Sequence, residues 1–156
     1  MRHRSRRSSS YASDAEKALV SEPIGSSADM KREKKQFLLV EDFEDSRFMM
    51  RRLLEMAGYS VLEATDGEQA VRIAVEARPA LILMDLSLPK MDGLTATRTI
   101  RQKRGLKRVP IVAVSAHDSD ESRAEALDAG CNEYVTKPID FDRLNDLIQQ
   151  FLDTGA

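Results

Sequence analysis

The sequence is poor in the residues that build disulfide frameworks, zinc sites and charge-relay sites. Its 156 residues include one cysteine (Cys131), two histidines (His3 and His117) and no tryptophan. A single cysteine excludes an intramolecular disulfide and a cysteine-rich zinc site. Two histidines make a His-based metal site or a Ser-His-Asp triad a poor interpretation. This composition favours a reduced, cytoplasmic setting in which Cys131 is a half-buried, inert thiol.

Long apolar runs are also missing. No stretch approaches the roughly 18 consecutive apolar residues that a membrane span needs, and no apolar segment near the start is typical of a secretory signal. We therefore expect no membrane partner. The length predicts one compact domain with some residues to spare.

Charge is spread unevenly along the chain. Residues 1–35 hold nine of the 24 Lys and Arg and five of the 26 Asp and Glu, so the remainder carries 15 basic against 21 acidic residues. An acidic globular part disfavours nucleic acid as a partner, because binding phosphates requires neutralising cations.

The first 35 residues show no apolar periodicity and are rich in Arg and Ser. Such a composition buries too little apolar area to offset chain entropy, so we expect a disordered tail over residues 1–35. It is an interaction arm, a targeting segment or an upstream extension, and in the last case Met30 would be the native start. We expect the folded domain over residues 36–153 and a short tail over residues 154–156.

Apolar runs and helical patterns alternate after this tail. Apolar runs without internal alternation are typical of strands covered on both faces, so the pattern predicts a doubly wound parallel α/β sheet with five strands and five helices. The predicted strands cover residues 37–40, 60–64, 80–84, 109–114 and 132–136. The predicted helices cover residues 44–57, 68–77, 93–104, 120–130 and 141–152. The first has apolar residues at helical spacing, namely Phe48, Met49, Leu53 and Met56. The starts of the others are marked by a Thr65–Glu68 capping box, by Asp92, by Ser119 or Asp120, and by Asp140.

Polar residues follow the apolar runs at one end only. Glu41 and Asp42 follow the first run, Asp85 the third and Ser115 the fourth, and Lys137 lies just after the fifth. Each alone could be a cap, a turn residue or a solvated side chain. Together they are expected to converge, because ligands bind beyond the carboxyl ends of parallel strands.

The chemistry of this set points to phosphoryl transfer. Three close carboxylates repel one another unless a cation balances them, and all-oxygen ligands favour Mg²⁺. Asp85 could then act as a nucleophile, while Lys137 and Ser115 contact phosphoryl oxygens. No general base is aimed at water, so an acyl phosphate should persist.

These residues carry a family resemblance. From Phe37 to about Leu152 the chain resembles the receiver domain of response regulators in two-component systems, including the single-domain chemotaxis type, which implies a flavodoxin-like fold. The matching motifs are residues 39–42 (LVED), 64–70 (ATDGEQA), 83–93 (LMDLSLPKMDG), 114–116 (VSA) and 137–138 (KP).

The resemblance implies a role for each acidic position. Asp85 matches the phosphoacceptor of the family. Glu41 and Asp42 match the acidic pair that holds Mg²⁺, directly or through water. Ser87 matches the residue whose backbone carbonyl binds the metal.

The resemblance also implies the remaining roles. Ser115 matches the hydroxyl that reorients toward the phosphoryl group, Lys137 the lysine that pairs with it, and Tyr134 the aromatic switch residue. The Lys137–Pro138 bond is expected to be cis. His117 lies where similar proteins vary; its imidazole either shields the phosphoryl group from water or is an exposed loop side chain.

The expected function is that of a stand-alone phosphoacceptor, not an enzyme with turnover, although it would assist its own phosphorylation and dephosphorylation. A histidine kinase or histidine phosphotransfer protein would be the donor. No output domain is expected after the last helix, so a downstream protein would bind the face made by the fourth helix, fifth strand and fifth helix.

Three alternatives remain open. A haloacid-dehalogenase-like phosphatase would have an acid where Ser87 stands. A flavodoxin-like FMN binder would place its phosphate beside Glu41 and Asp42, which repel it. A pseudo-receiver would share the fold without being phosphorylated.

Overall fold

The structure, a computed structural model, describes residues 34–154. The disorder predicted for residues 1–35 and the proposed start at Met30 therefore fall almost wholly outside the described residues and stay predictions. Within residues 34–154 no helix is long and apolar enough to cross a membrane.

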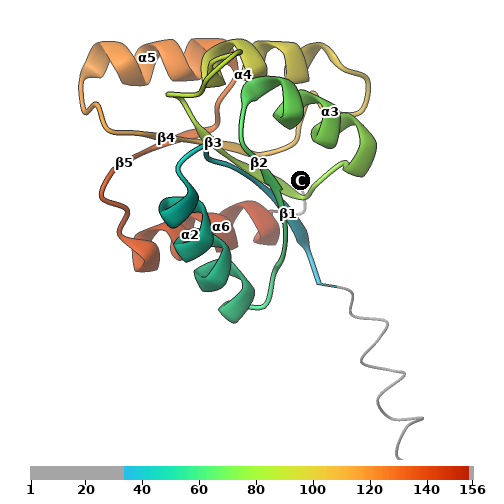
Figure 1. The fold of residues 1–156 in the computed structure, drawn as a ribbon, viewed down its shortest axis with the longest axis vertical. Coiled ribbons are helices and arrows are strands. Elements are labelled where there is room, and N and C mark those ends of the chain that lie inside the picture. Colours follow the sequence, from blue (N-terminus) through green and yellow to red (C-terminus); the bar gives the residue numbers. More distant parts are fainter. Residues whose placement is uncertain (1–33, 155–156) are drawn as a thin grey trace, which may run out of the picture. The chain divides into compact units, whose positions relative to one another are not determined.

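The described residues form a parallel sheet with helices on both faces (Figure 1). The strand order is β2-β1-β3-β4-β5, which confirms the predicted doubly wound α/β class. The strands are β1 (Gln36–Val40), β2 (Ser60–Ala64), β3 (Leu81–Asp85), β4 (Ile111–Ser115) and β5 (Glu133–Thr136). The helices are α2 (Glu44–Met56), α3 (Gly67–Ala77), α4 (Gly93–Gln102), α5 (Asp120–Ala129) and α6 (Phe141–Asp153).

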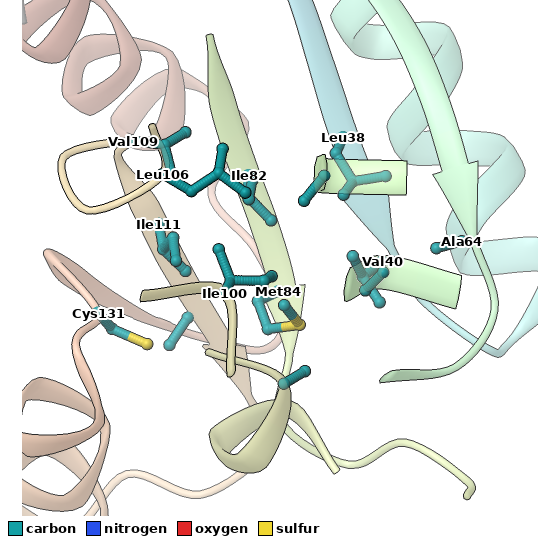
Figure 2. Packing of buried hydrophobic residues seen from close by; sticks show 14 of the residues in the cluster. Leu38, Val40, Ala64, Ile82, Met84, Ile100, Leu106, Val109, Ile111 and Cys131 are labelled. Carbon is teal, nitrogen blue, oxygen red and sulfur yellow. The ribbon is translucent and has the colours of Figure 1, made fainter. Parts of the chain in front are cut away.

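Alternate residues of each central strand face opposite helix layers. Leu38 and Val40 of β1 pack in a cluster with small residues of α3, α4 and α5, whereas Phe37 and Leu39 pack with α2 and α6. Figure 2 shows the first of these clusters, with Ile100 of α4 against the sheet. Burial on both faces explains why the strand sequences are continuously apolar.

Two sequence predictions need correction. The cap of α3 is Asp66, whose carboxylate accepts a hydrogen bond from the Gln69 N–H at 2.8 Å, so the predicted Thr65–Glu68 capping box is wrong. The Gln69 side chain instead accepts hydrogen bonds from the Thr65 N–H and hydroxyl. The third and fourth strands begin one and two residues later than predicted and end at the polar residues Asp85 and Ser115.

Helix α2 turns an unexpected side to the core. Leu54 is its fully buried residue, and Met50 packs against the same cluster. Phe48, Met49 and Met56, whose spacing predicts the helix, are 55%, 65% and 77% exposed. The helix is therefore apolar on both its inner and its outer sides.

Gly93 fixes how close α4 can come to the end of β3. A Cβ atom there would overlap the Asp85 carbonyl oxygen and lie 2.7 Å from the Leu86 Cα. Both neighbours are backbone atoms, so the added methyl group has no flexible side chain to displace.

We expect Gly93→Ala to lower the free energy of unfolding by about 1–3 kcal/mol, because an overpacked core must shift backbone. Urea denaturation measures the change. Thr95→Ala, on the exposed side of the same helix turn, should stay within about 0.5 kcal/mol. Equal effects of the two changes would show that the close approach of α4 is not limiting.

Candidate functional site

Four neighbouring strands deliver the polar residues to one edge of the sheet. Asp85 ends β3, Ser115 ends β4, Glu41 directly follows β1 and Lys137 directly follows β5. Because β1, β3, β4 and β5 are adjacent in that order, these residues lie side by side. Glu41, Asp85 and Ser115 are buried, although each carries a polar side chain.

Three carboxylates make the centre of this edge. One oxygen each from Glu41, Asp42 and Asp85 lies within 4.8 Å of the others. Glu41 and Asp85 are buried whereas Asp42 is exposed, so the cluster opens to solvent on one side. Hard oxygen ligands that leave room for water suit Mg²⁺, which keeps several waters when proteins bind it. The residues therefore fit the metal expected from the sequence.

Lys137 supplies the only cation that contacts two of these carboxylates within residues 34–154. Its Nζ lies 3.0 Å from Glu41 Oε1 and 3.0 Å from Asp85 Oδ2. Burial works to lower the pKa of Lys137, but the hydrogen bonds to Asp85 and Glu41 outweigh it and raise that pKa. The ammonium is therefore charged at neutral pH. The peptide bond between Lys137 and Pro138 is cis.

Glu41 is held in an environment that disfavours its charge. Burial and then the neighbouring Asp85 raise its pKa, while hydrogen bonds from the Phe43 N–H (3.1 Å) and from Lys137 act in the opposite direction. Mutual repulsion of close carboxylates is the expected cause of the Asp85 contribution. Additional positive charge beside Glu41 would relieve this strain.

Both oxygens of Asp85 already have donors. The Ser87 N–H donates to Oδ1 at 2.8 Å, and the Lys137 ammonium donates to Oδ2. The carboxylate is thus fixed in orientation at the end of β3. The role predicted for the Ser87 carbonyl stays a prediction.

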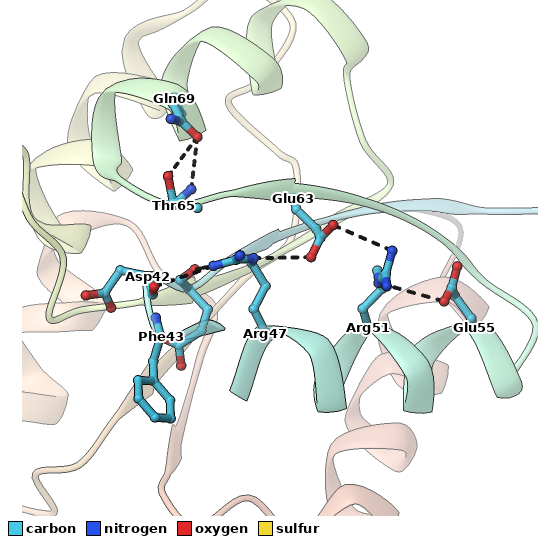
Figure 3. A network of polar contacts seen from close by, with 9 residues as sticks. Asp42, Phe43, Arg47, Arg51, Glu55, Glu63, Thr65 and Gln69 are labelled. Carbon is cyan, nitrogen blue, oxygen red and sulfur yellow. Dashed lines mark hydrogen bonds and ion pairs between the residues drawn. The ribbon is translucent and has the colours of Figure 1, made fainter. Parts of the chain in front are cut away.

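Arg47 of α2 shapes the turn that carries the acidic pair, and sequence reasoning missed it. Its Nη1 donates to the Glu41 carbonyl at 3.1 Å and its Nε to Glu63 of β2 at 3.2 Å (Figure 3). The Asp42 carbonyl is also within reach at 3.5 Å. Nothing in the spacing of Arg47 and Glu63 along the chain signals this contact, since they are sixteen positions apart.

Ser115 and Tyr134 are joined through the backbone of His117. The His117 N–H donates to the Ser115 hydroxyl at 3.1 Å, and the Tyr134 hydroxyl donates to the His117 carbonyl at 2.6 Å. Tyr134 is buried, and the guanidinium carbon of Arg123 lies 5.0 Å from its ring centre. The His117 side chain is exposed, so the shielding role predicted for it stays a prediction.

A cavity of about 500 Å³ adjoins the acidic edge. Met49, Met50 and Leu53 of α2 form one wall, and Ile139 and Phe141 form another. The polar end of the cavity consists of Glu41, Asp85 and Lys137. An apolar recess is therefore continuous with the carboxylate cluster, a feature that the sequence did not reveal.

The family model described as "Response regulator receiver domain" matches residues 37–149. The chain belongs to this family. The described residues thus form a receiver domain of the two-component signalling type, a class of signalling proteins. Two of the alternatives, the dehalogenase-like phosphatase and the flavodoxin-like FMN binder, are wrong at the level of family.

Individual relatives agree with this assignment. The polar-differentiation response regulator DivK of Brucella anthropi is 34% identical over 118 residues, which cover 76% of this chain and 96% of DivK. The receiver domain of the sensor histidine kinase PA1611 from Pseudomonas aeruginosa, with magnesium coordinated in its active-site cleft, is 38% identical with a TM-score of 0.73, covering 78% of this chain and 99% of that one. The chemotaxis protein CheY4 of Vibrio cholerae is 28% identical with a TM-score of 0.73, covering 76% and 99%.

We predict that Lys137→Met raises the pKa of Glu41 further, because the ammonium lowers that pKa in the intact site. Carboxyl-carbon NMR of the metal-free protein follows the titration. Lys90→Met is the matched control, since the Lys90 ammonium lies 3.7 Å from Asp66 rather than beside Glu41. An unchanged Glu41 titration in Lys137→Met would contradict the electrostatic account of the cluster.

Proposed function

We propose that Asp85 accepts a phosphoryl group from a phosphohistidine donor in a Mg²⁺-dependent reaction, and that the protein signals through the resulting change of shape. The observation that carries the proposal is the buried Asp85 carboxylate, with two further carboxylates within 4.8 Å and an ammonium at 3.0 Å. Phosphoryl transfer depends mainly on positioning and charge neutralisation, which this set of groups supplies.

The proposed reaction needs little proton chemistry from the protein. An Asp85 oxygen forms the new bond to phosphorus as the bond to the donor imidazole nitrogen breaks, and the imidazole leaves with the electron pair. Lys137, paired with the Asp85 carboxylate, would lie beside the negative charge that the phosphoryl oxygens bring. Mg²⁺, held by Glu41, Asp42, Asp85 and the Ser87 carbonyl, would neutralise phosphoryl oxygens.

Ser115 and Tyr134 are proposed to transmit the phosphorylated state. The support is their connection through His117, because turning the Ser115 hydroxyl toward a phosphoryl oxygen would move its Oγ away from the His117 N–H, from which it now accepts a hydrogen bond. A shift of this loop would alter the contact of Tyr134 with the His117 carbonyl. The face formed by α5, β5 and α6 would then present a different surface to a downstream protein.

The apolar outer side of α2 is proposed to receive the donor. Phe48 and Met49 are more than half exposed, as is Phe43 just before the helix at 60%. Met49 also lines the recess that ends at Asp85 and Lys137. A donor bound here would bring its phosphohistidine to Asp85. Such a partner, like the reduced thiol of Cys131, fits a cytoplasmic location, which we propose as well.

The same fold without phosphorylation, a pseudo-receiver, makes a distinct prediction. We expect Asp85→Asn to abolish Mg²⁺-dependent labelling by a phosphohistidine donor or by acetyl phosphate, because the nucleophile is lost. Asp92→Asn should be labelled as the wild type is, since Asn caps α4 as well as Asp does. Mass spectrometry locates the added phosphoryl group. An unlabelled wild type would establish the pseudo-receiver, and a labelled Asp85→Asn would show that another residue accepts the phosphoryl group.

Donor docking is tested by a pair of charge insertions on one helix. Met49→Glu should slow transfer from a phosphohistidine protein by about tenfold or more, because a charge would be buried in an apolar contact. Labelling by acetyl phosphate, which needs no docking surface, should not change. Met56→Glu, at the other end of α2 and even more exposed, should transfer normally. Equal transfer rates in the two variants would exclude this surface.

A further inference from the structure

The edge of the sheet opposite the carboxylates carries a separate group of cations. In this fold the strands begin, and the helices end, at that edge. Between the end of α4 and the start of β4 the sequence KRGLKRVP places Lys103, Arg104, Lys107 and Arg108 within six residues, with no acidic residue among them. All four are exposed.

The fold sorts this loop into buried and exposed positions. Leu106 and Val109 are 2% and 9% exposed and point into the core beside Ile100 and Ile111 (Figure 2). Lys107 and Arg108 lie between these two residues, and Lys103 and Arg104 precede Leu106. The cations are exposed while the apolar residues anchor the loop. The loop therefore presents charged side chains to solvent while its apolar side chains are packed in the core.

Arg101 holds this loop in place through hydrogen bonds. Its guanidinium and Nε donate to the Leu106 carbonyl (3.0 Å), the Gly130 carbonyl (2.9 Å) and the Asn132 side chain (2.8 Å). These bonds tie the loop to the segment before β5. Arg101 is thus used in structure, whereas the cations around it are not.

A fifth cation joins the loop from α3. Arg78 ends that helix in a left-handed conformation, and its Nη1 lies 3.0 Å from the position a Cβ would take on Gly105. The end of the loop is also attached to β3, the strand that follows Arg78. The Pro110 carbonyl, just before β4, accepts a hydrogen bond from the Ile82 N–H. We call the five residues Arg78, Lys103, Arg104, Lys107 and Arg108 the basic edge.

The basic edge has no internal counter-charge. Within residues 34–154 none of its five side chains makes an ion pair, although the same region of the chain contains seven ion-paired contacts elsewhere. Five exposed cations brought together without acids repel one another, and this repulsion is relieved when an anion binds.

We propose that the basic edge binds a short acidic segment of a partner protein, rich in Asp and Glu. Acidic residues at the same sheet edge limit the size of the occupant: Glu76 lies in the last turn of α3 on one side, and Asp128 in the last turn of α5 and Glu133 at the start of β5 lie on the other. A duplex nucleic acid or a membrane plane would extend over these carboxylates. A short peptide segment contacts the five cations alone.

The location gives this contact a role of its own. The basic edge lies at the strand starts, and Asp85 lies at a strand end. A partner held there leaves the phosphoacceptor site and the apolar side of α2 open, so recruitment does not require phosphorylation.

The test measures binding of a labelled oligoglutamate peptide to the full chain by fluorescence anisotropy. The variant Arg104→Glu with Lys107→Glu should bind roughly tenfold more weakly, as expected when a few exposed ion pairs are lost and replaced by repulsion. Arg52→Glu with Arg143→Glu changes the net charge equally on exposed residues of α2 and α6, and should bind within about twofold of wild type. Circular dichroism verifies that both variants are folded. The wild type and both double variants keep the same basic residues before position 36, so these residues cannot cause a difference in affinity between the proteins.

Equal peptide affinity in the two double variants would overturn the proposal, because the peptide would then respond to net charge or to the N-terminal residues. Duplex DNA and vesicles containing phosphatidylserine are measured in parallel. Tighter binding of either one than of the peptide, lost with Arg104→Glu and Lys107→Glu, would overturn the choice of a protein segment as occupant.

Discussion

The functional edge of this receiver depends on one electrostatic constraint: three carboxylates share a small space with one ammonium. Glu41 and Asp85 are buried, so water screens their repulsion poorly, and Lys137 at 3.0 Å from both offsets only part of it. Burial, and then the neighbouring Asp85, raise the pKa of Glu41 despite this ammonium. A site of this kind would gain stability from a further cation, which is the electrostatic reason that the acidic cluster fits the proposed Mg²⁺.

The parallel sheet makes this arrangement possible. Adjacent parallel strands place their carboxyl ends at one edge, so residues far apart in sequence become neighbours without any special loop. Glu41 and Lys137 are separated by 96 positions and are in contact. The same topology gathers the strand starts at the opposite edge, and cations collect there. The carboxylate cluster and the basic edge therefore lie at opposite ends of the sheet.

Sequence patterns predicted the class of fold and the convergence of the polar residues, because both depend on residue type at regular positions. Runs such as Leu81–Met84 leave little choice but a buried strand, and the polar residue that follows marks its end. Patterns failed where several similar residues compete. Thr65 and Asp66 can each cap a helix. In the structure the Asp66 carboxylate caps α3, whereas Thr65 donates hydrogen bonds to the Gln69 side chain. Helix α2 has apolar residues on both its inner and its outer sides. Periodicity alone therefore does not identify Leu54, rather than Phe48, as the residue that packs against the sheet. Arg47 was missed because its contacts with the Glu41 carbonyl and Glu63 exist only once β1, β2 and α2 are assembled.

Two contacts hold the Tyr134 side chain in its buried position. Its hydroxyl is bonded to the His117 carbonyl while Arg123, itself held by Asp118 at 2.9 Å, covers its ring. Rotating the ring outward would break the hydrogen bond and remove the ring from beneath Arg123 in the same movement. Because one rotation would end both contacts, exposure of the Tyr134 ring and release of the Arg123 guanidinium would occur together, and a shift of the backbone at His117 would reach the surface of α5.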